Sequence, residues 1–169
     1  AEWYTPLTQS RGENPKSLVL RTSAGVGMIG QYNRRAGLSP FERFYLGGVF
    51  LSGFVLDGRE ILNLRGYDDL SLTAPDRNTG APVVAKYGAE LRYPLSTNPS
   101  ATIYTLAFLE GGNTWEDPRA FNPFQVYRSA GVGLRIFLPM FGLLGLDYGW
   151  RLDEVESIPN MDRSQFHFS

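Results

Sequence analysis

Apolar and polar residues alternate with a period of two along much of the chain, and two is the period of a β-strand. In residues 17–32, Leu18, Leu20 and Val26 fall on one face, while serine, arginine and glycine fall on the other. Four later stretches alternate in the same way: residues 83–93, 127–138, 142–152 and 165–168. Residues 102–115 are also strand-like, but they are apolar on both faces until Glu110. Helical periodicity is weak throughout, so the pattern predicts an all-β chain of antiparallel strands.

Short and long connections alternate between these predicted strands. Residues 94–99 and 139–142 make short turns, whereas residues 33–82, 116–125 and 153–163 are longer and more polar. Transmembrane β-barrels show this alternation, with short turns on the periplasmic side and longer loops outside. The sequence therefore favours a barrel wall in which every second connection lies at the same rim.

Proline stands at the end of three predicted strands, at Pro6, Pro94 and Pro139. Proline has no N–H to donate to a ladder, so we expect each of these strands to stop there. All three positions belong to the rim of the short turns. Aromatic residues next to them fit the aromatic girdle of a membrane barrel.

Composition narrows the class of protein. The 16 Lys and Arg are balanced by 17 Asp and Glu, so no basic surface indicates nucleic acid as a partner. The chain has no cysteine and no apolar run of about 18 residues, which excludes disulfides and a transmembrane helix. A soluble β-sandwich or lipocalin-like barrel would alternate in the same way, but glycine and arginine on the polar face favour a wet lumen. About six strands are recognisable, fewer than the roughly eight that close a barrel, so we expect part of a larger barrel.

Motifs for catalysis, nucleotides or metals are weak in this sequence. Residues 25–30 match the glycine pattern of a dinucleotide site, but they lie inside a predicted strand instead of between a strand and a helix. Asp76 could open a calcium loop, yet Tyr87 stands where the bidentate glutamate belongs. His167 is the only histidine and has no nucleophile or metal-ligand partner near it in the sequence. We therefore expect no enzyme activity, no metal and no cofactor.

Residues 33–82 form a predicted connection that is too long and too apolar for an ordinary loop. Structureless loops of this length are uncommon in compact domains. Aromatic and aliphatic residues run through it, so it should pack against other parts of the protein instead of staying solvated. It contains two motifs, a segment with Phe44, Tyr45, Gly47 and Gly48, and the sequence Leu64-Arg65-Gly66-Tyr67.

These two motifs resemble loop six of the BamA family, in the superfamily of outer-membrane assembly and two-partner secretion proteins, where a Gly-Gly pair precedes an Arg-Gly-aromatic motif. Three later strings are similar to strands of that family: residues 108–115, residues 128–135, and the closing strand with Gln165, Phe166, His167 and Phe168. The resemblance covers residues 1–169 as one partial barrel domain. It implies an antiparallel transmembrane β-barrel of sixteen strands, with about the last six here and residues 33–82 folded inward. Residues 49–64 lengthen the usual spacing between the two loop motifs, and Ser169 stands without the terminal aromatic of such barrels.

The resemblance also implies a function. Proteins of this family are insertases that fold other β-barrels into the bacterial outer membrane, by opening sideways between the first and last strands. Their partners would be outer-membrane lipid, unfolded β-barrel clients and accessory subunits of the assembly machine. Two-partner secretion proteins share the Arg-Gly-aromatic motif, so a pore that exports one protein is the alternative. A soluble binding domain is a third possibility.

The Arg-Gly-Tyr motif is the candidate functional site. We expect Arg65 to reach into the lumen and pair with Glu90, which lies on the polar face of its strand, and with Glu110, which interrupts an otherwise apolar one. The family resemblance implies that both glutamates lie beside the tip of this loop. A planar guanidinium suits carboxylate partners. Gly66 would allow a tight turn beside the barrel wall, and Tyr67 would add a packing face. A solvated arginine on a surface loop is the alternative.

Overall fold

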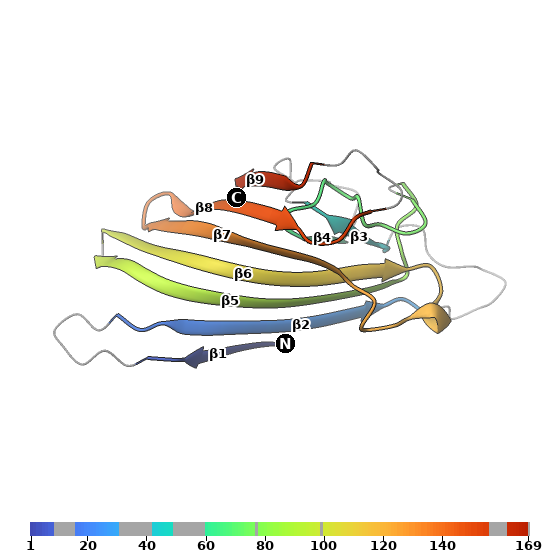
Figure 1. The fold of residues 1–169 in the computed structure, drawn as a ribbon, viewed down its shortest axis with the longest axis horizontal. Coiled ribbons are helices and arrows are strands. Elements are labelled where there is room, and N and C mark those ends of the chain that lie inside the picture. The colour runs from blue at the N-terminus through green and yellow to red at the C-terminus, as the bar shows by residue number, and fades with distance from the viewer. Residues whose placement is uncertain are drawn as a thin grey trace.

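One antiparallel sheet of seven strands, in the order β1-β2-β5-β6-β7-β8-β9, makes up most of the fold (Figure 1). The computed structural model describes residues 1–8, 16–30, 42–48, 60–76, 78–98, 100–155 and 162–168. The strands of the sheet are β1 (Glu2–Pro6), β2 (Val19–Met28), β5 (Val83–Asn98), β6 (Ala101–Trp115), β7 (Tyr127–Leu138), β8 (Gly142–Arg151) and β9 (Ser164–Phe168). The predicted all-β, antiparallel architecture is confirmed.

Two further strands lie inside the long connection between β2 and β5. They are β3 (Phe44–Gly47) and β4 (Glu60–Asn63), which pair in parallel, and β3 contacts β5 and β6. A short 3-10 helix, η1 (Pro118–Ala120), lies between β6 and β7. Residues 33–41 and 49–59 of the predicted inward loop lie outside the described residues, as does Ser169.

The sheet is an open arc and not a closed barrel. β1 and β9 form its two edges, and the N- and C-termini mark these edges in Figure 1. The β5–β6 and β7–β8 turns lie at one end, and the β6–β7 connection lies at the other. This arrangement is what one section of a barrel wall requires. In the ranges that the structure describes, no helix is long and apolar enough to cross a membrane.

One sequence-based prediction about strand ends is wrong. β1 ends at Pro6 and β7 ends just before Pro139, but β5 continues through Pro94 to Asn98. Pro94 lies opposite Tyr104, and the register with β6 shifts between Pro94 and Ser96. A bulge of this kind leaves a residue out of the ladder, so a strand can pass through a residue that has no N–H.

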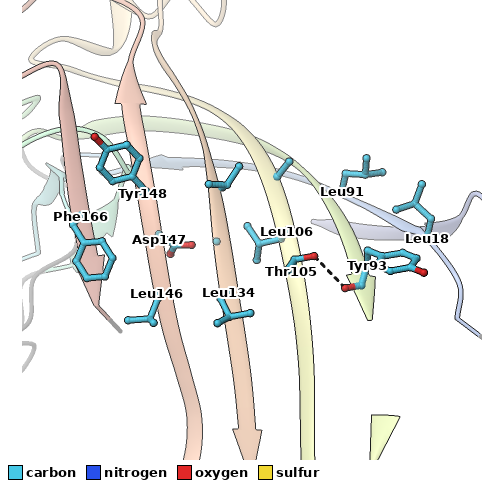
Figure 2. A pocket seen from close by; sticks show the side chains of 13 residues that line it. Leu18, Leu91, Tyr93, Thr105, Leu106, Leu134, Leu146, Asp147, Tyr148 and Phe166 are labelled. Atoms are coloured by element: carbon cyan, nitrogen blue, oxygen red, sulfur yellow. Dashed lines mark hydrogen bonds between the residues drawn. The ribbon is translucent and has the colours of Figure 1, made fainter. Parts of the chain in front are cut away.

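The two faces of the sheet differ sharply. Residues 60–76 and 78–81 cover the face that we call the inner face, where Glu90, Glu110 and Asp147 are buried. The opposite, outer face is apolar and exposed. In Figure 2, Leu134 of β7, Leu146 and Tyr148 of β8 and Phe166 of β9 lie side by side along a shallow apolar hollow, to which Leu91 of β5 also contributes. An apolar outer face and a charged inner face suit a wall between lipid and lumen.

Candidate functional site

The Gly-Gly segment holds the base of the inward loop. The Phe44 N–H donates to the Ala81 carbonyl oxygen and the Ala81 N–H donates back to that of Phe44, both at 2.9 Å. The Tyr45 hydroxyl donates to the carbonyl oxygen of Asn78 at 3.1 Å. Phe44 and Tyr45, both singled out from the sequence, therefore attach β3 to the residues that lead into β5.

Gly47 and Gly48 lie directly against the segment that follows the arginine motif. The Gly48 N–H donates to the Asp68 carbonyl oxygen at 2.9 Å, and the Leu64 N–H donates to that of Gly47. A Cβ placed on Gly48 would overlap the carbonyl oxygen of Tyr67, and a Cβ on Gly47 would lie 2.6 Å from that of Asp68. The Gly-Gly pair thus makes room for the backbone of the second motif, and the two motifs form one unit.

Apolar packing fixes the stem of this unit. Leu64 and Tyr67 are fully buried in a cluster with Leu46, Leu72 and Val155. The Tyr67 hydroxyl also donates to a backbone carbonyl oxygen of β7, that of Arg128, at 2.7 Å. Tyr67 therefore contributes a packing face and one hydrogen bond to the wall.

Arg65 lies on the inner face of the sheet, and the structure brings it together with both glutamates that the sequence suggested. Its Nη2 donates to Glu90 Oε1 at 2.7 Å and to Glu110 Oε1 at 2.6 Å. Its backbone N–H donates to Glu110 Oε2 at 3.2 Å. Arg65 is only 6% exposed, so the alternative of a solvated surface arginine does not describe this geometry.

Two further contacts of Arg65 were not anticipated from the sequence. Nη1 lies 3.5 Å from Asp147 Oδ1 on β8, and the guanidinium carbon lies 3.7 Å from the centre of the Phe108 ring. A cation over an aromatic face is favourable, most of all where water is excluded. Phe108 explains why β6 is apolar on both faces. The outer face of β6 is apolar toward lipid, and on the inner face Phe108 packs against Arg65.

The carboxylates around Arg65 also hold other cations of the wall. Glu90 Oε2 accepts from Arg92 Nε at 2.9 Å and lies 3.5 Å from Arg21 Nη1. Glu110 Oε1 lies 3.5 Å from Lys86 Nζ. Asp147 accepts two hydrogen bonds, at 2.8 and 2.7 Å, from the guanidinium of Arg135. Buried charges are tolerated when they are paired in this way.

Gly66 turns the loop against the last two strands. Its φ of +87° is a left-handed conformation that favours glycine. Its N–H donates to His167 Nε2 on β9 at 2.9 Å. A Cβ on Gly149 of β8 would lie 2.8 Å from the Gly66 nitrogen. The tight turn beside the wall, expected from the sequence, is present here.

The closing strand β9 presents alternate side chains to the two faces. Phe166 and Phe168 are exposed on the outer face, and His167 is buried on the inner face. Gln165 also points inward, where its Nε2 donates to Asp68 Oδ1 of the loop. The alternation of residues 165–168 predicted which side chains face outward, but it did not predict that Gln165 and His167 bond to the loop.

An ion pair joins the start of β7 to Asp153, just after the end of β8. The guanidinium and backbone N–H of Arg128 donate to the Asp153 carboxylate at 2.7 to 3.0 Å. These hydrogen bonds lower the pKa of the Asp153 carboxyl below its usual range. The Arg128 side chain is 61% exposed, so this pair is a useful surface reference for the buried pairs of Arg65.

The fold and the two loop motifs can be set beside the match of this sequence to a known protein family. A family model described as the Omp85 superfamily domain matches residues 1–169. The chain belongs to the Omp85 superfamily. A comparison with curated protein sequences finds no match. Omp85 proteins are outer-membrane β-barrels, and they include both insertases and two-partner secretion transporters. The Omp85 assignment thus agrees with the arc of antiparallel strands and its apolar outer face.

Two motifs in the sequence concern other kinds of site, a metal site and a nucleotide site. Among the residues that the structure describes, no group of three His, Cys, Asp or Glu side chains could hold a metal ion. Residues 25–28 of the glycine pattern lie within β2, where a nucleotide-binding turn has no place. What the Arg65 unit can do chemically is hold strands together, through a fixed set of hydrogen bonds and ion pairs.

Proposed function

We propose that the chain is the C-terminal barrel portion of a BamA-type insertase, which folds and inserts β-barrel proteins into the bacterial outer membrane. The observation that carries the proposal is that β9 is an edge strand. In the described residues this strand pairs with β8 alone in the seven-stranded sheet and forms the edge of the arc. The sequence around Gly47-Gly48 supports the insertase over its relatives, whereas the Arg65 motif fits both the insertase and the secretion pore.

An edge strand in a membrane tends to pair with another strand. Its unpaired N–H and C=O groups are costly in hydrocarbon, because no water is present to satisfy them. A strand of an unfolded client can pair with them and so remove that cost. Each hydrogen bond formed by the client replaces one that the barrel would otherwise make with itself, so the exchange needs no nucleotide.

The outer face of β9 suits this exchange. Phe166 and Phe168 are exposed there, at 65% and 42%. Aromatic side chains on the lipid side keep the strand at the membrane while its ladder partner changes. The proposed partners are accordingly outer-membrane lipid and unfolded β-barrel clients, with accessory subunits that deliver the clients.

A cross-linking experiment on the full-length protein tests the proposal. A cysteine at Phe166 is joined by a disulfide to a cysteine on the first strand of the barrel, and the assembly of client barrels is measured in cells. We expect the lock to stop client assembly and a reductant to restore it. The control joins Val132→Cys to Tyr148→Cys, which lie opposite each other on β7 and β8 and never separate in the proposed mechanism.

The outcomes separate the insertase from the alternative. Client assembly that continues with the seam locked contradicts lateral opening. If the lock instead stops the export of one secreted protein and leaves outer-membrane barrels intact, the two-partner secretion function replaces the insertase. Loss of assembly in the Val132–Tyr148 control would show that rigidity of the wall, and not the seam, is what the disulfides disturb.

A further inference from the structure

The inward loop touches every strand from β5 to β9 through four consecutive residues. Arg65 bonds to Glu90 of β5 and Glu110 of β6 and lies near Asp147 of β8. Tyr67 bonds to the backbone of β7. The other two residues of the four, at positions 66 and 68, both bond to β9. We call residues 65–68 the brace.

We propose that the brace holds the closing strand from the inner face, through His167 and Gln165, and that it sets the position of β9 along β8. His167 Nε2 accepts from the Gly66 N–H at 2.9 Å, and Gln165 Nε2 donates to Asp68 Oδ1. This inference concerns what keeps β9 in place. Its consequence for clients rests on the proposed function.

The spacing of the two contacts carries the argument. His167 and Gln165 are two residues apart on β9, and Gly66 and Asp68 are two residues apart on the brace. Two matched points fix both the position and the direction of a strand, whereas one point would allow it to pivot. Side chains in a strand alternate between faces, so a slip by one residue would turn both groups outward and lose both bonds.

The ladder to β8 leaves a role for such a brace. In the described residues, the ladder between β9 and β8 covers Ser164 to Phe168. Gln165 and His167 lie within it, so the inner contacts act on the same residues that the ladder holds. The brace itself is firmly held, because Arg65 is buried among the carboxylates of three other strands. β9 is thus attached to the body of the wall twice, once through its ladder and once from inside.

The donor and acceptor chemistry of the two contacts is specific. Nε2 of His167 can accept from Gly66 only when it carries no proton, which places the imidazole proton on Nδ1. Glutamine at this position keeps an acceptor oxygen at a similar reach, whereas leucine keeps bulk and loses the acceptor. Gln165→Leu removes the donor to Asp68 in the same way. These substitutions separate hydrogen bonding from packing.

The brace makes strand release and loop movement one event. β9 can leave its place only by breaking both inner contacts or by taking residues 66–68 with it. Since the same four residues hold Arg65 among its carboxylates, a change in the loop reaches the edge strand directly. His167 and Gln165 are therefore positioning residues for the proposed opening.

Hydrogen–deuterium exchange on the full-length protein in lipid nanodiscs tests the brace. For His167→Leu, Gln165→Leu and the double variant, we expect backbone amides of residues 164–168 to exchange faster, by roughly three- to tenfold for each lost contact. Residues 129–137 of β7 should keep their native rate, which shows that the barrel has folded. His167→Gln should restore slow exchange.

The matched control is Tyr67→Phe, which removes one hydrogen bond from the brace to β7 and leaves both contacts with β9. Its exchange in residues 164–168 should equal that of the native protein. Native exchange in β9 of the double variant, or equally fast exchange in Tyr67→Phe, would overturn the brace.

Client assembly is measured separately in the same variants. Faster exchange in β9 with unchanged client assembly leaves the brace standing and counts against opening at this seam as the function. Unchanged exchange with impaired assembly has the opposite meaning, because it removes the brace and leaves the proposed function in place.

Discussion

The backbones of Gly66 and Gly149 lie in direct contact. A Cβ on Gly149 would lie 2.8 Å from the Gly66 nitrogen and 3.0 Å from its Cα, and a Cβ on Gly66 would lie 3.3 Å from the carbonyl carbon of Gly149. Glycine on the inner face of β8 is therefore what lets the loop lie flat on the wall. With this approach, Arg65 lies within reach of carboxylates from three strands at once.

Alanine at Gly149 should displace the brace. The added methyl group would press on backbone atoms of residue 66, which have no room to move aside, and overpacking of this kind costs about 1–3 kcal/mol. We expect lower stability of the barrel and faster proteolysis of the inward loop, measured by the gel shift of the heated protein and by limited protease digestion.

Gly25→Ala is the control for that substitution. Gly25 of β2 also lies at a position that faces the inner side of the sheet, but a Cβ on Gly25 would have no atom within 4 Å. Alanine should be neutral or slightly stabilising, because glycine weakens a strand by about 0.5–1 kcal/mol. Equal loss of stability in both variants would mean that close contact at Gly149 is not the cause.

Arg65→Ala should loosen the whole inward loop. The substitution leaves Glu90 and Glu110 buried with one cation fewer, and breaking a buried pair costs about 3–5 kcal/mol. Arg65→Lys should fall between the native protein and alanine, since an ammonium keeps the charge but loses the fork that reaches several carboxylates. Protease protection of the loop and the free energy of unfolding in lipid both report the effect.

Arg128→Ala is the matched reference. Arg128 pairs with Asp153 at the surface, where ion pairs contribute about 1 kcal/mol or less. The loop should stay protected in this variant. A loss of stability as large as that of Arg65→Ala would show that any broken ion pair has the same effect, and the buried network would have no special role.

Much of this site was accessible from the sequence because side-chain parity is a local property. Alternation within one strand places Glu90 on the inner face and Phe166 on the outer face without knowledge of any neighbour. The pairing of Arg65 with Glu90 and Glu110 came from parity combined with a family resemblance. The structure contains that pairing, while its functional role stays a prediction.

The remaining partners depend on register, which is not a local property. Asp147 reaches Arg65 only because β8 lies two strands away from β6 at a matching height, and His167 reaches Gly66 only because β9 pairs with β8 in one register. Nothing in the local sequence fixes either relation. The misplaced strand end at Pro94 has a similar origin, because a bulge depends on the partner strand as well as on the proline itself.

Two positions on β7 test which face meets lipid. Ser129 is fully buried on the inner face, opposite Glu110 of β6, and Val132 is 51% exposed on the outer face. In membranes, a water-soluble maleimide should label neither Ser129→Cys nor Val132→Cys, and a lipid-soluble one should label only the second. Adding Arg65→Ala should make Ser129→Cys react with the water-soluble reagent. Rapid aqueous labelling at Val132→Cys would contradict the membrane orientation.

The last prediction follows from the different numbers of cations that lie near the Glu90 and Glu110 carboxylates. In Arg65→Ala, Glu90 keeps two cations, Arg92 at 2.9 Å and Arg21 at 3.5 Å. Glu110 keeps the backbone N–H of residue 65 at 3.2 Å but, among the described residues, Lys86 at 3.5 Å is its one remaining cation. Glu110 is therefore the carboxylate that loses more of its charge compensation in Arg65→Ala. Glu110→Gln, added to Arg65→Ala, should recover at least about 1 kcal/mol of stability, because it removes a buried charge that has lost its partner. Glu90→Gln in the same background should recover nothing, since it deprives Arg92 and Arg21 of a carboxylate. Unfolding free energies of the native protein, Arg65→Ala and the two double variants give the comparison. Equal recovery by both glutamine substitutions would show that the carboxylates act as one pool of negative charge and that the individual contacts of Arg65 do not matter.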